Sequence, residues 1–456
     1  MMAAAGTVDI QEFMNSRPLS RYQVMVLLLC FLVVAADGFD TAAVGYIAPA
    51  LRAQWGVTPA QLAPLFGAGL FGLMAGAFLF GPLADKVGRK AVLVFATAAF
   101  GVASVLSATA TSIEALTIWR FVTGIGLGGA MPSAITLTSE YCPERNRSLL
   151  VMIMFCGFTM GGALGGLSAA TLIADFGWQG VLVLGGALPL VLAAVLLFLL
   201  PESVRYLVLK GGQDARVGAV LRRIDPRAPL DGARFVGVRR VEGSPVALLF
   251  KGGLAAGTLL LWLTFFMSLL VFYLLTSWLP TLLNSAGQTA ASAAMIALML
   301  PIGSTAGAIL IGMLMDRLNP HAVLLGSYTL AAVFILLLGL STASPWLLVL
   351  AVFGAGIGTG GSQIGINALS AAYYPTASRA TGVSWANAVG RTGSVVGSMV
   401  GGYLLGLGWS LATVFAVAAL PALLAGIAIF AKGQLGTPAL AAPVIPGAAS
   451  HPAAQR

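Results

Sequence analysis

The sequence predicts an all-α membrane protein in which twelve transmembrane helices form two six-helix halves related by pseudo-symmetry. Hydrophobic residues make up 59% of the 456 residues and charged residues only 9%, whereas about 25% of the residues of a typical globular domain are charged. Twelve apolar segments follow one another, and most reach the roughly 20 residues that a membrane-spanning helix needs. The sequence of the fourth segment also recurs in the tenth, which indicates a duplicated six-helix unit.

The apolar segments define the expected elements in order. The first six lie near residues 24–50, 61–83, 91–109, 115–138, 148–172 and 180–200, and the second six near 254–280, 291–315, 322–341, 346–372, 382–406 and 409–431. The chain accordingly divides into a polar tail (1–23), a first half (24–200), a central loop (201–253), a second half (254–431) and a second tail (432–456).

The distribution of positive charge predicts the topology. A net charge of +9 would suggest a nucleic-acid partner in a soluble chain, but here the charges follow the positive-inside rule. If both termini are cytoplasmic, only Arg52 lies outside and only Arg120 and Arg391 lie within spans, so 24 − 3 = 21 of the Lys and Arg residues lie inside. We therefore expect cytoplasmic termini, contact with anionic lipid head groups and no nucleic-acid partner.

Cysteine and histidine usage gives no sign of a disulfide framework, a metal site or an enzyme. The three cysteines are odd in number and lie in spans or at a cytoplasmic edge, so no disulfide framework is indicated. Both histidines, His321 and His451, fall outside the spans, so we expect no metal site and no buried histidine base. No nucleophile–base pair is visible in the spans either, and we expect no enzyme activity and no cofactor.

The first span carries two acids, Asp37 and Asp40, inside an otherwise apolar run. Residues three apart on a helix lie about 60° from one another, so both carboxylates project from one face and should share one environment. Each ionised Asp in mid-membrane costs roughly 2.5 to 3.5 kcal/mol, which favours a protein-lined cavity over a lipid-facing position. Neighbouring carboxylates in such a cavity repel and favour binding a proton, so the pair is a candidate proton carrier. The alternative is a pair of polar caps at a helix break at Gly38.

The second span ends in the run Gly81-Pro82-Leu83-Ala84-Asp85-Lys86-Val87-Gly88-Arg89-Lys90. Its own glycines, from Gly67 to Gly76, provide a small-residue face for close helix packing. In the run itself, Gly88 permits an unusual backbone conformation, and Asp85 can pair with a helix terminus or a basic partner. This run resembles the signature that follows the second span in the major facilitator superfamily, whose fold has the twelve helices and two halves predicted above.

The fourth and tenth spans carry the internal repeat. The glycine run that starts at Gly124 returns at Gly356, and 356 − 124 = 232. The same offset relates Arg147 to Arg379, and an offset of 231 relates the Asp85-Lys86 pair to Asp316-Arg317. No strand precedes the first glycine run, so helix packing explains it better than dinucleotide binding. The first-span acids have no counterpart, because an offset of 232 leads to Leu269 and Phe272, and this asymmetry favours a chemical role for them.

The central loop carries ten Lys or Arg residues, and we expect a linker between the halves that is partly helical at most. Its first residues, from Pro201 to Leu207, resemble the end of the sixth span in the sugar-porter and organic-ion branches of the superfamily.

Several polar residues in the spans are candidates for the substrate site. Arg391 lies about ten residues into the eleventh span, where a guanidinium needs an anion such as a substrate carboxylate; the alternative is a structural ion pair. Arg120 is either part of the site or of a gating pair. Gln363 and Asn367 share one face of the tenth span and either bind a hydroxyl group or bridge helices. Trp385 and the aromatic residues of the seventh span either stack on a substrate ring or form an interfacial belt.

Taken together, the acid pair, the complete loop motif, Glu140 at the end of the fourth span and Arg391 resemble the aromatic acid:proton symporter branch of the superfamily. This resemblance covers nearly the full length. It implies a multi-pass protein of the bacterial inner membrane that imports hydroxybenzoate-type carboxylates with protons as the coupling ion, and we expect a monomer. It also implies that Asp37 and Asp40 couple the proton, and that the residues of the loops and span ends control gating, namely Gly81, Asp85, Gly88, Arg89, Glu140, Arg147, Asp316, Arg317 and Arg379.

Two other functions stay open from the sequence. A proton-coupled drug antiporter usually carries a Gly-Pro pair in its fifth span, where this chain has Gly161-Gly162. A non-transporting receptor of the same fold is the second alternative, although such receptors usually append a signalling domain.

Overall fold

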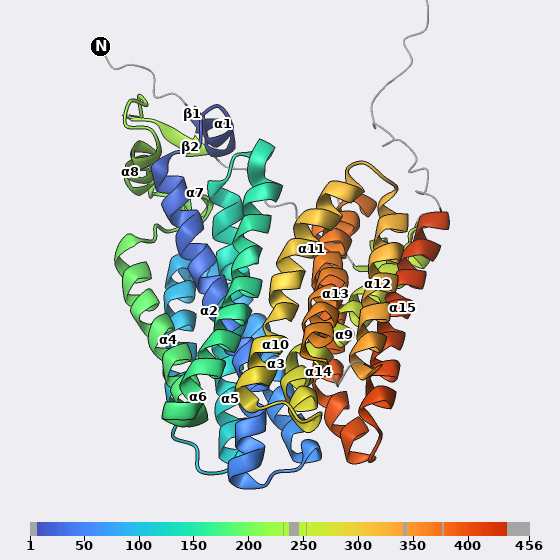
Figure 1. Cartoon of the computed structure of the whole chain (residues 1–456). Helices are drawn as coiled ribbons and strands as arrows, with labels where there is room; N and C mark the ends of the chain where they lie inside the picture. Colours follow the sequence, from blue (N-terminus) through green and yellow to red (C-terminus); the bar gives the residue numbers. More distant parts are fainter. Residues whose placement is uncertain are drawn as a thin grey trace, which may run out of the picture.

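The computed structural model describes residues 7–230, 232–236, 246–251, 253–340, 344–375 and 378–435. Long helices form two bundles that stand side by side, and both ends of the described chain lie on one side of the molecule (Figure 1). We call this the terminal side and the other end the opposite side.

The first bundle contains α2 (Arg21–Trp55), α3 (Pro59–Val87), α4 (Arg89–Ser107), α5 (Ile113–Tyr141) and α6 (Arg147–Leu199). The second contains α9 (Ala255–Ser285), α10 (Ala290–Ala297), α11 (Met299–Met315), α12 (Pro320–Leu340), α13 (Pro345–Tyr373), α14 (Arg379–Gly406) and α15 (Leu411–Gln434).

Within the described residues, ten helical segments are long and apolar enough to cross a membrane. The α6 segment holds two of the predicted spans, because its backbone leaves the helical conformation at Gly177, where φ is 65°. The α14 helix, which carries Arg391, is not among the ten. Counting α6 as two spans and adding α14 gives the twelve predicted segments.

The helix bounds repeat with the offset that the sequence predicts. The helices α5 and α13 start 232 residues apart (345 − 113) and also end 232 residues apart (373 − 141). Glycines allow these helices to pack closely on their neighbours. A Cβ atom at Gly72 or Gly76 would collide with backbone oxygens of α5, and one at Gly124 would collide with Gly69 of α3. The glycine run is therefore a helix-packing surface, as expected.

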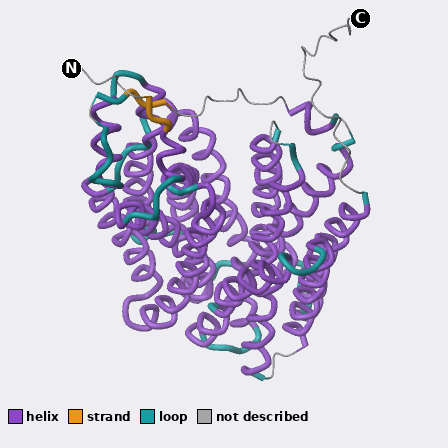
Figure 2. The backbone as a smooth tube through the Cα atoms, turned by 90° about the horizontal axis from the view of Figure 1, so that it is seen from above, coloured by secondary structure: helices purple, strands orange, loops and turns teal. Residues whose placement is uncertain are grey.

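A small additional layer covers the terminal side of the first bundle (Figure 2). It contains β1 (Thr7–Asp9), α1 (Ile10–Asn15), η1 (Glu144–Asn146), α7 (Val204–Lys210), α8 (Asp214–Ile224) and β2 (Arg234–Val236), and η2 (Val246–Phe250) follows before the second bundle. The strands β1 and β2 pair in parallel, with Val8 opposite Phe235.

The first tail is therefore more ordered than the predicted polar tail. Ile10, Phe13 and Met14 are buried in one cluster with apolar residues of α8 and β2, and this burial stabilises the short helix α1. Arg17 donates a 2.7 Å hydrogen bond to Asp225 and so lowers the pKa of that carboxyl.

The two bundles touch each other at mid-depth and on the opposite side. There Thr159 and Thr305 share a 2.6 Å hydrogen bond, and the rings of Phe66 and Trp278 meet edge to face at 4.8 Å. Arg52, near the end of α2, donates to Ser285 at the end of α9. These contacts join the two bundles, so this conformation is closed on the opposite side.

Candidate functional site

Asp37 and Asp40 lie in the middle of α2, and each is only 1% exposed. Asp40 forms a two-pronged ion pair with Arg120 of α5, at 2.5 Å from Nη2 and 2.9 Å from Nη1. Ser104 of α4 donates a further hydrogen bond of 3.0 Å to the same carboxylate. Both partners belong to the first bundle, so Asp40 is fully engaged inside one half.

Asp37 is buried like Asp40, whose charge also acts on it, but it has different hydrogen-bond partners. Its Oδ1 accepts a 3.2 Å hydrogen bond from Thr41, one turn further along α2. Its Oδ2 is buried and has no hydrogen-bond partner. The charge that acts on it most strongly belongs to Arg391 of the second bundle. The 60° between the two side chains is enough to give the two carboxylates different hydrogen-bond partners.

Arg391 lies near the middle of α14 and is half-buried. It donates to the hydroxyl of Tyr273 on α9 at 3.3 Å and contacts the sulfur of Met131 on α5 at 3.4 Å. Among the described residues no carboxylate lies within 4.0 Å of this guanidinium, as every ion pair within that limit involves another cation. Arg391 therefore has donors left for an anion.

A series of hydrogen-bonded polar groups extends across the second bundle from α14, the helix that carries Arg391. Asn387, one turn before Arg391, donates to Asn367 of α13 at 3.2 Å, and Asn367 donates to the backbone oxygen of Gln363 at 2.8 Å. The side-chain oxygen of Gln363 accepts from Ser268 at 2.9 Å, which in turn accepts from Tyr328 at 2.8 Å. The predicted residues Gln363 and Asn367 thus belong to one hydrogen-bond network with Asn387 on the helix of Arg391.

A small cavity of about 20 Å³ lies beside Asp37. Gly38, Thr41, Phe158, Phe272 and Thr276 are among its lining residues, which come from both bundles. A space of this size holds a water molecule but not an aromatic ring. It follows that this cavity does not hold a ring-sized ligand in the present conformation.

Two predicted substrate residues do not join this site. Arg120 is 2% exposed and is held by Asp40, so it has no surface to offer a substrate, and of its two predicted roles the pair fits and the substrate site does not. Trp385 is 42% exposed and stacks on Trp262 with ring centroids 5.9 Å apart. Among the described residues, neither tryptophan forms a hydrogen bond or a cation–π contact with Arg391 or Asp37.

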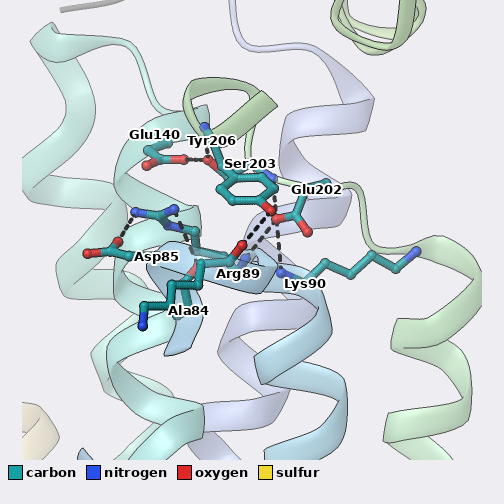
Figure 3. Close-up of polar contacts among 9 residues, drawn as sticks. Ala84, Asp85, Arg89, Lys90, Glu140, Glu202, Ser203 and Tyr206 are labelled. Carbon is teal, nitrogen blue, oxygen red and sulfur yellow. Dashed lines mark hydrogen bonds and ion pairs between the residues drawn. The ribbon is translucent and has the colours of Figure 1, made fainter. Parts of the chain in front are cut away.

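The predicted loop motif forms a compact group on the terminal side (Figure 3). Gly88 adopts a φ of 107°, which is the unusual backbone conformation expected there. Asp85 forms an ion pair with Arg89 at 2.5 Å. Glu140 accepts a short hydrogen bond from the hydroxyl of Ser203 in the central loop.

Glu202 is the centre of this group and was not predicted as a site residue. Its Oε1 accepts hydrogen bonds from the backbone nitrogens of Arg89 at 2.8 Å and Lys90 at 3.1 Å, so it caps the first turn of α4. Tyr206 donates to the backbone oxygen of Lys86 at 3.0 Å. Both residues belong to the run from Pro201 to Leu207. The resemblance of this run to other branches of the superfamily was the signal that could have identified them as part of the group.

The remaining predicted gating residues lie at helix ends. Arg147 donates to Gln11 of the first tail at 3.0 Å, and Arg379 donates to the backbone oxygen of Tyr374 at 3.4 Å. Gly81, Asp316 and Arg317 are exposed.

Comparisons with known proteins identify a family, relatives and solved structures that are similar to this chain. The family model of the Major Facilitator Superfamily matches residues 30–307 and 261–448. The chain is 49% identical over 436 residues to the 4-hydroxybenzoate transporter PcaK of Pseudomonas aeruginosa, covering 95% of this chain and 97% of that protein. It is 44% identical over 441 residues to the gallate transporter of Pseudomonas putida, covering 96% and 98%. Its fold is similar to the inward open conformation of the xylose transporter XylE from E. coli, with a TM-score of 0.72 at 16% identity over 90% of this chain and 95% of that one.

Proposed function

This chain belongs to the Major Facilitator Superfamily, and we infer that it is a secondary active transporter that imports hydroxybenzoate-type aromatic carboxylates together with protons. It is a transporter and not an enzyme. The relatives named above transport 4-hydroxybenzoate and gallate. Both are aromatic rings that carry one carboxylate and at least one hydroxyl group, and this shared chemistry defines the proposed substrate class.

One observation carries the proposal. Arg391 of the second half is the cation whose charge acts on the buried Asp37 of the first half, and the guanidinium has no carboxylate within ion-pair distance among the described residues. A cation at this depth is costly unless an anion meets it. A substrate carboxylate supplies that anion, and the forked guanidinium suits it.

Asp37 supplies the coupling to the proton. While Asp37 is ionised, its charge attracts Arg391 and competes with the substrate carboxylate for the guanidinium. A proton on Asp37 removes this competition, so the substrate binds best to the protonated state. Because a ligand shifts a conformational equilibrium only through its differential affinity, proton and substrate must be bound together to favour the step that carries both inward.

Asp40 acts differently in this scheme. Its carboxylate is held by the ion pair with Arg120 and by the hydrogen bond from Ser104. Asp40 therefore positions α2 against α4 and α5, and Asp37 alone carries the proton.

The terminal side is the cytoplasmic side in this proposal. The excess of Lys and Arg in the tails and the central loop supports that orientation in a bacterial inner membrane. The present conformation, closed on the opposite side, is then the inward-facing state. The site lies within one chain, so a monomer is the functional unit. The exposed Asp316, Arg317 and Arg379, together with the Asp85 and Glu140 groups, form the contacts that close the cytoplasmic side in the other state.

Uptake into proteoliposomes tests the proposal. Labelled 4-hydroxybenzoate should accumulate only when an inward proton gradient is imposed. Arg391→Ala should abolish uptake and Arg391→Lys should retain a small part of it, because lysine keeps the charge but loses the forked geometry. Arg216→Ala, on the exposed face of α8, is the matched control. Failure of the wild-type protein to accumulate the label under any gradient, together with expulsion of a lipophilic cation, would support the antiporter instead.

A further inference from the structure

Asn387 is a polar residue of the site that none of the sequence patterns singled out. It precedes Arg391 by four residues on α14, so the two side chains lie on the same face, about one helical turn or roughly 6 Å apart along the axis. Both residues are half-buried. The exposed residues Trp385, Ala388 and Thr392 mark a different face of the same helix.

The orientation of the Asn387 amide is fixed by two acceptors. Its Nδ2 donates to the backbone oxygen of Val383 at 3.0 Å and to Oδ1 of Asn367 at 3.2 Å. A backbone oxygen only accepts hydrogen bonds, so the nitrogen of the amide must be the atom that faces it. Asn367 is itself held by its own bond to the Gln363 backbone.

The other end of the amide is available. Among the described residues, no group donates a hydrogen bond to Asn387 Oδ1. The atom is not fully buried either, since it is absent from the set of buried polar atoms without a partner. It is therefore an open acceptor beside Arg391, accessible to a small molecule. A ring hydroxyl is a matching donor, and a para-substituted benzoate separates its carboxylate and hydroxyl by about one helical turn.

We propose that Asn387 Oδ1 accepts a hydrogen bond from the ring hydroxyl of the substrate while Arg391 binds its carboxylate. This inference rests on the proposed function and adds a specificity residue to it. Asn387 selects hydroxylated benzoates over benzoate, and para-hydroxyl over ortho-hydroxyl compounds, because an ortho group lies too close to the carboxylate to reach the next turn of α14. Asn367 is a positioning residue that holds the Asn387 amide.

The test compares ligands on purified wild-type protein and on Asn387→Ala and Asn387→Leu, by ligand-induced thermal stabilisation and by competition with labelled 4-hydroxybenzoate uptake. Both variants should raise the half-saturating concentration of 4-hydroxybenzoate about three- to tenfold, as expected for one hydrogen bond, and leave that of benzoate unchanged. Thr392→Val, which removes a hydroxyl from the exposed face of α14, is the matched control and should change neither.

A comparison on the wild-type protein alone keeps the inference testable if both variants fail to fold. There 4-aminobenzoate, which keeps a donor at the para position, should bind more tightly than benzoate and 4-methoxybenzoate, which have none. Equal weakening of 4-hydroxybenzoate and benzoate by the variants, or equal binding of all four ligands by the wild type, would overturn the role of Asn387 and leave the transporter in place. A wild-type protein that neither binds nor accumulates any of these acids would instead refute the proposed function, and the inference with it.

Discussion

Thr41 and Tyr273 occupy equivalent positions in the two halves, 273 − 41 = 232 residues apart, and each hydrogen-bonds the charged residue of its own half. Thr41 donates to Asp37 at 3.2 Å, and Tyr273 accepts from Arg391 at 3.3 Å. The duplicated scaffold therefore carries an acid in one half and a guanidinium in the other, each hydrogen-bonded to a hydroxyl group of its own half. In the proposed mechanism, a change in the charge of Asp37 acts on Arg391 and so on substrate binding.

Asp37→Asn should abolish accumulation of 4-hydroxybenzoate against a gradient but retain exchange of labelled for unlabelled substrate across the membrane. Asparagine resembles the protonated acid, so the carrier can still bind substrate and change conformation but cannot release a proton. Counterflow and gradient-driven uptake in proteoliposomes distinguish the two activities. Asp175→Asn, an exposed acid, is the control and should behave as the wild type. Normal gradient-driven accumulation by Asp37→Asn would contradict the coupling role.

Asp40→Asn should destabilise the protein through an unpaired buried cation, because removal of one partner of a buried ion pair typically costs about 3 to 5 kcal/mol. The double variant Asp40→Asn with Arg120→Gln removes both charges and should recover part of the loss. Thermal unfolding in detergent measures the difference. If Asp40→Asn is as stable as the wild type and only uncouples the proton, Asp40 is a proton carrier after all.

Gly88→Ala should destabilise the junction of α3 and α4 by about 1 to 3 kcal/mol, since a φ of 107° is strained for any residue with a Cβ atom. The added methyl group would also collide with the carboxylate of Glu202. Gly81→Ala is the matched control from the same motif, because a Cβ atom there meets nothing within 4 Å. Apparent melting temperatures of the two variants should separate clearly. Equal values would show that the backbone of this turn is not under the constraint described above.

A disulfide between Thr159→Cys and Thr305→Cys should lock the conformation that is closed on the opposite side. The two hydroxyl oxygens are 2.6 Å apart across the halves, close enough for a bond between the replacing sulfurs. The natural Cys30, Cys142 and Cys156 are first replaced, so that only the new pair can react. Oxidation should block uptake and a reducing agent should restore it, while each single cysteine variant remains insensitive. Full uptake by the oxidised double variant would mean that this contact does not open during transport.

The fold could be predicted almost completely from the sequence, because long apolar segments and a repeated glycine pattern report directly on spans and duplication. The depth of Asp37 and Arg391 in their helices could be predicted as well. The interaction between their charges could not, because position along a helix does not reveal which neighbour a side chain faces. The same limit applies to Asp40, whose ion pair with Arg120 has no signal in the sequence.

Two other features of the structure were not predicted from the sequence, for different reasons. Glu202 caps a helix that begins 113 residues earlier, and no local pattern encodes that pairing. The first tail was predicted as merely polar, although Ile10, Phe13 and Met14 have the three- and four-residue spacing of a helix with one buried face. That spacing was the signal that could have revealed α1.

The pairing of β1 with β2 has a consequence for how the protein is made. Residues 7–9 can find their partner only after residues 234–236 have left the ribosome, by which time all spans of the first half have been synthesised. The beginning of the chain is thus the last part of the first half that can be fixed in place. At the earliest moment when this pairing is possible, most of the second half has not yet been synthesised.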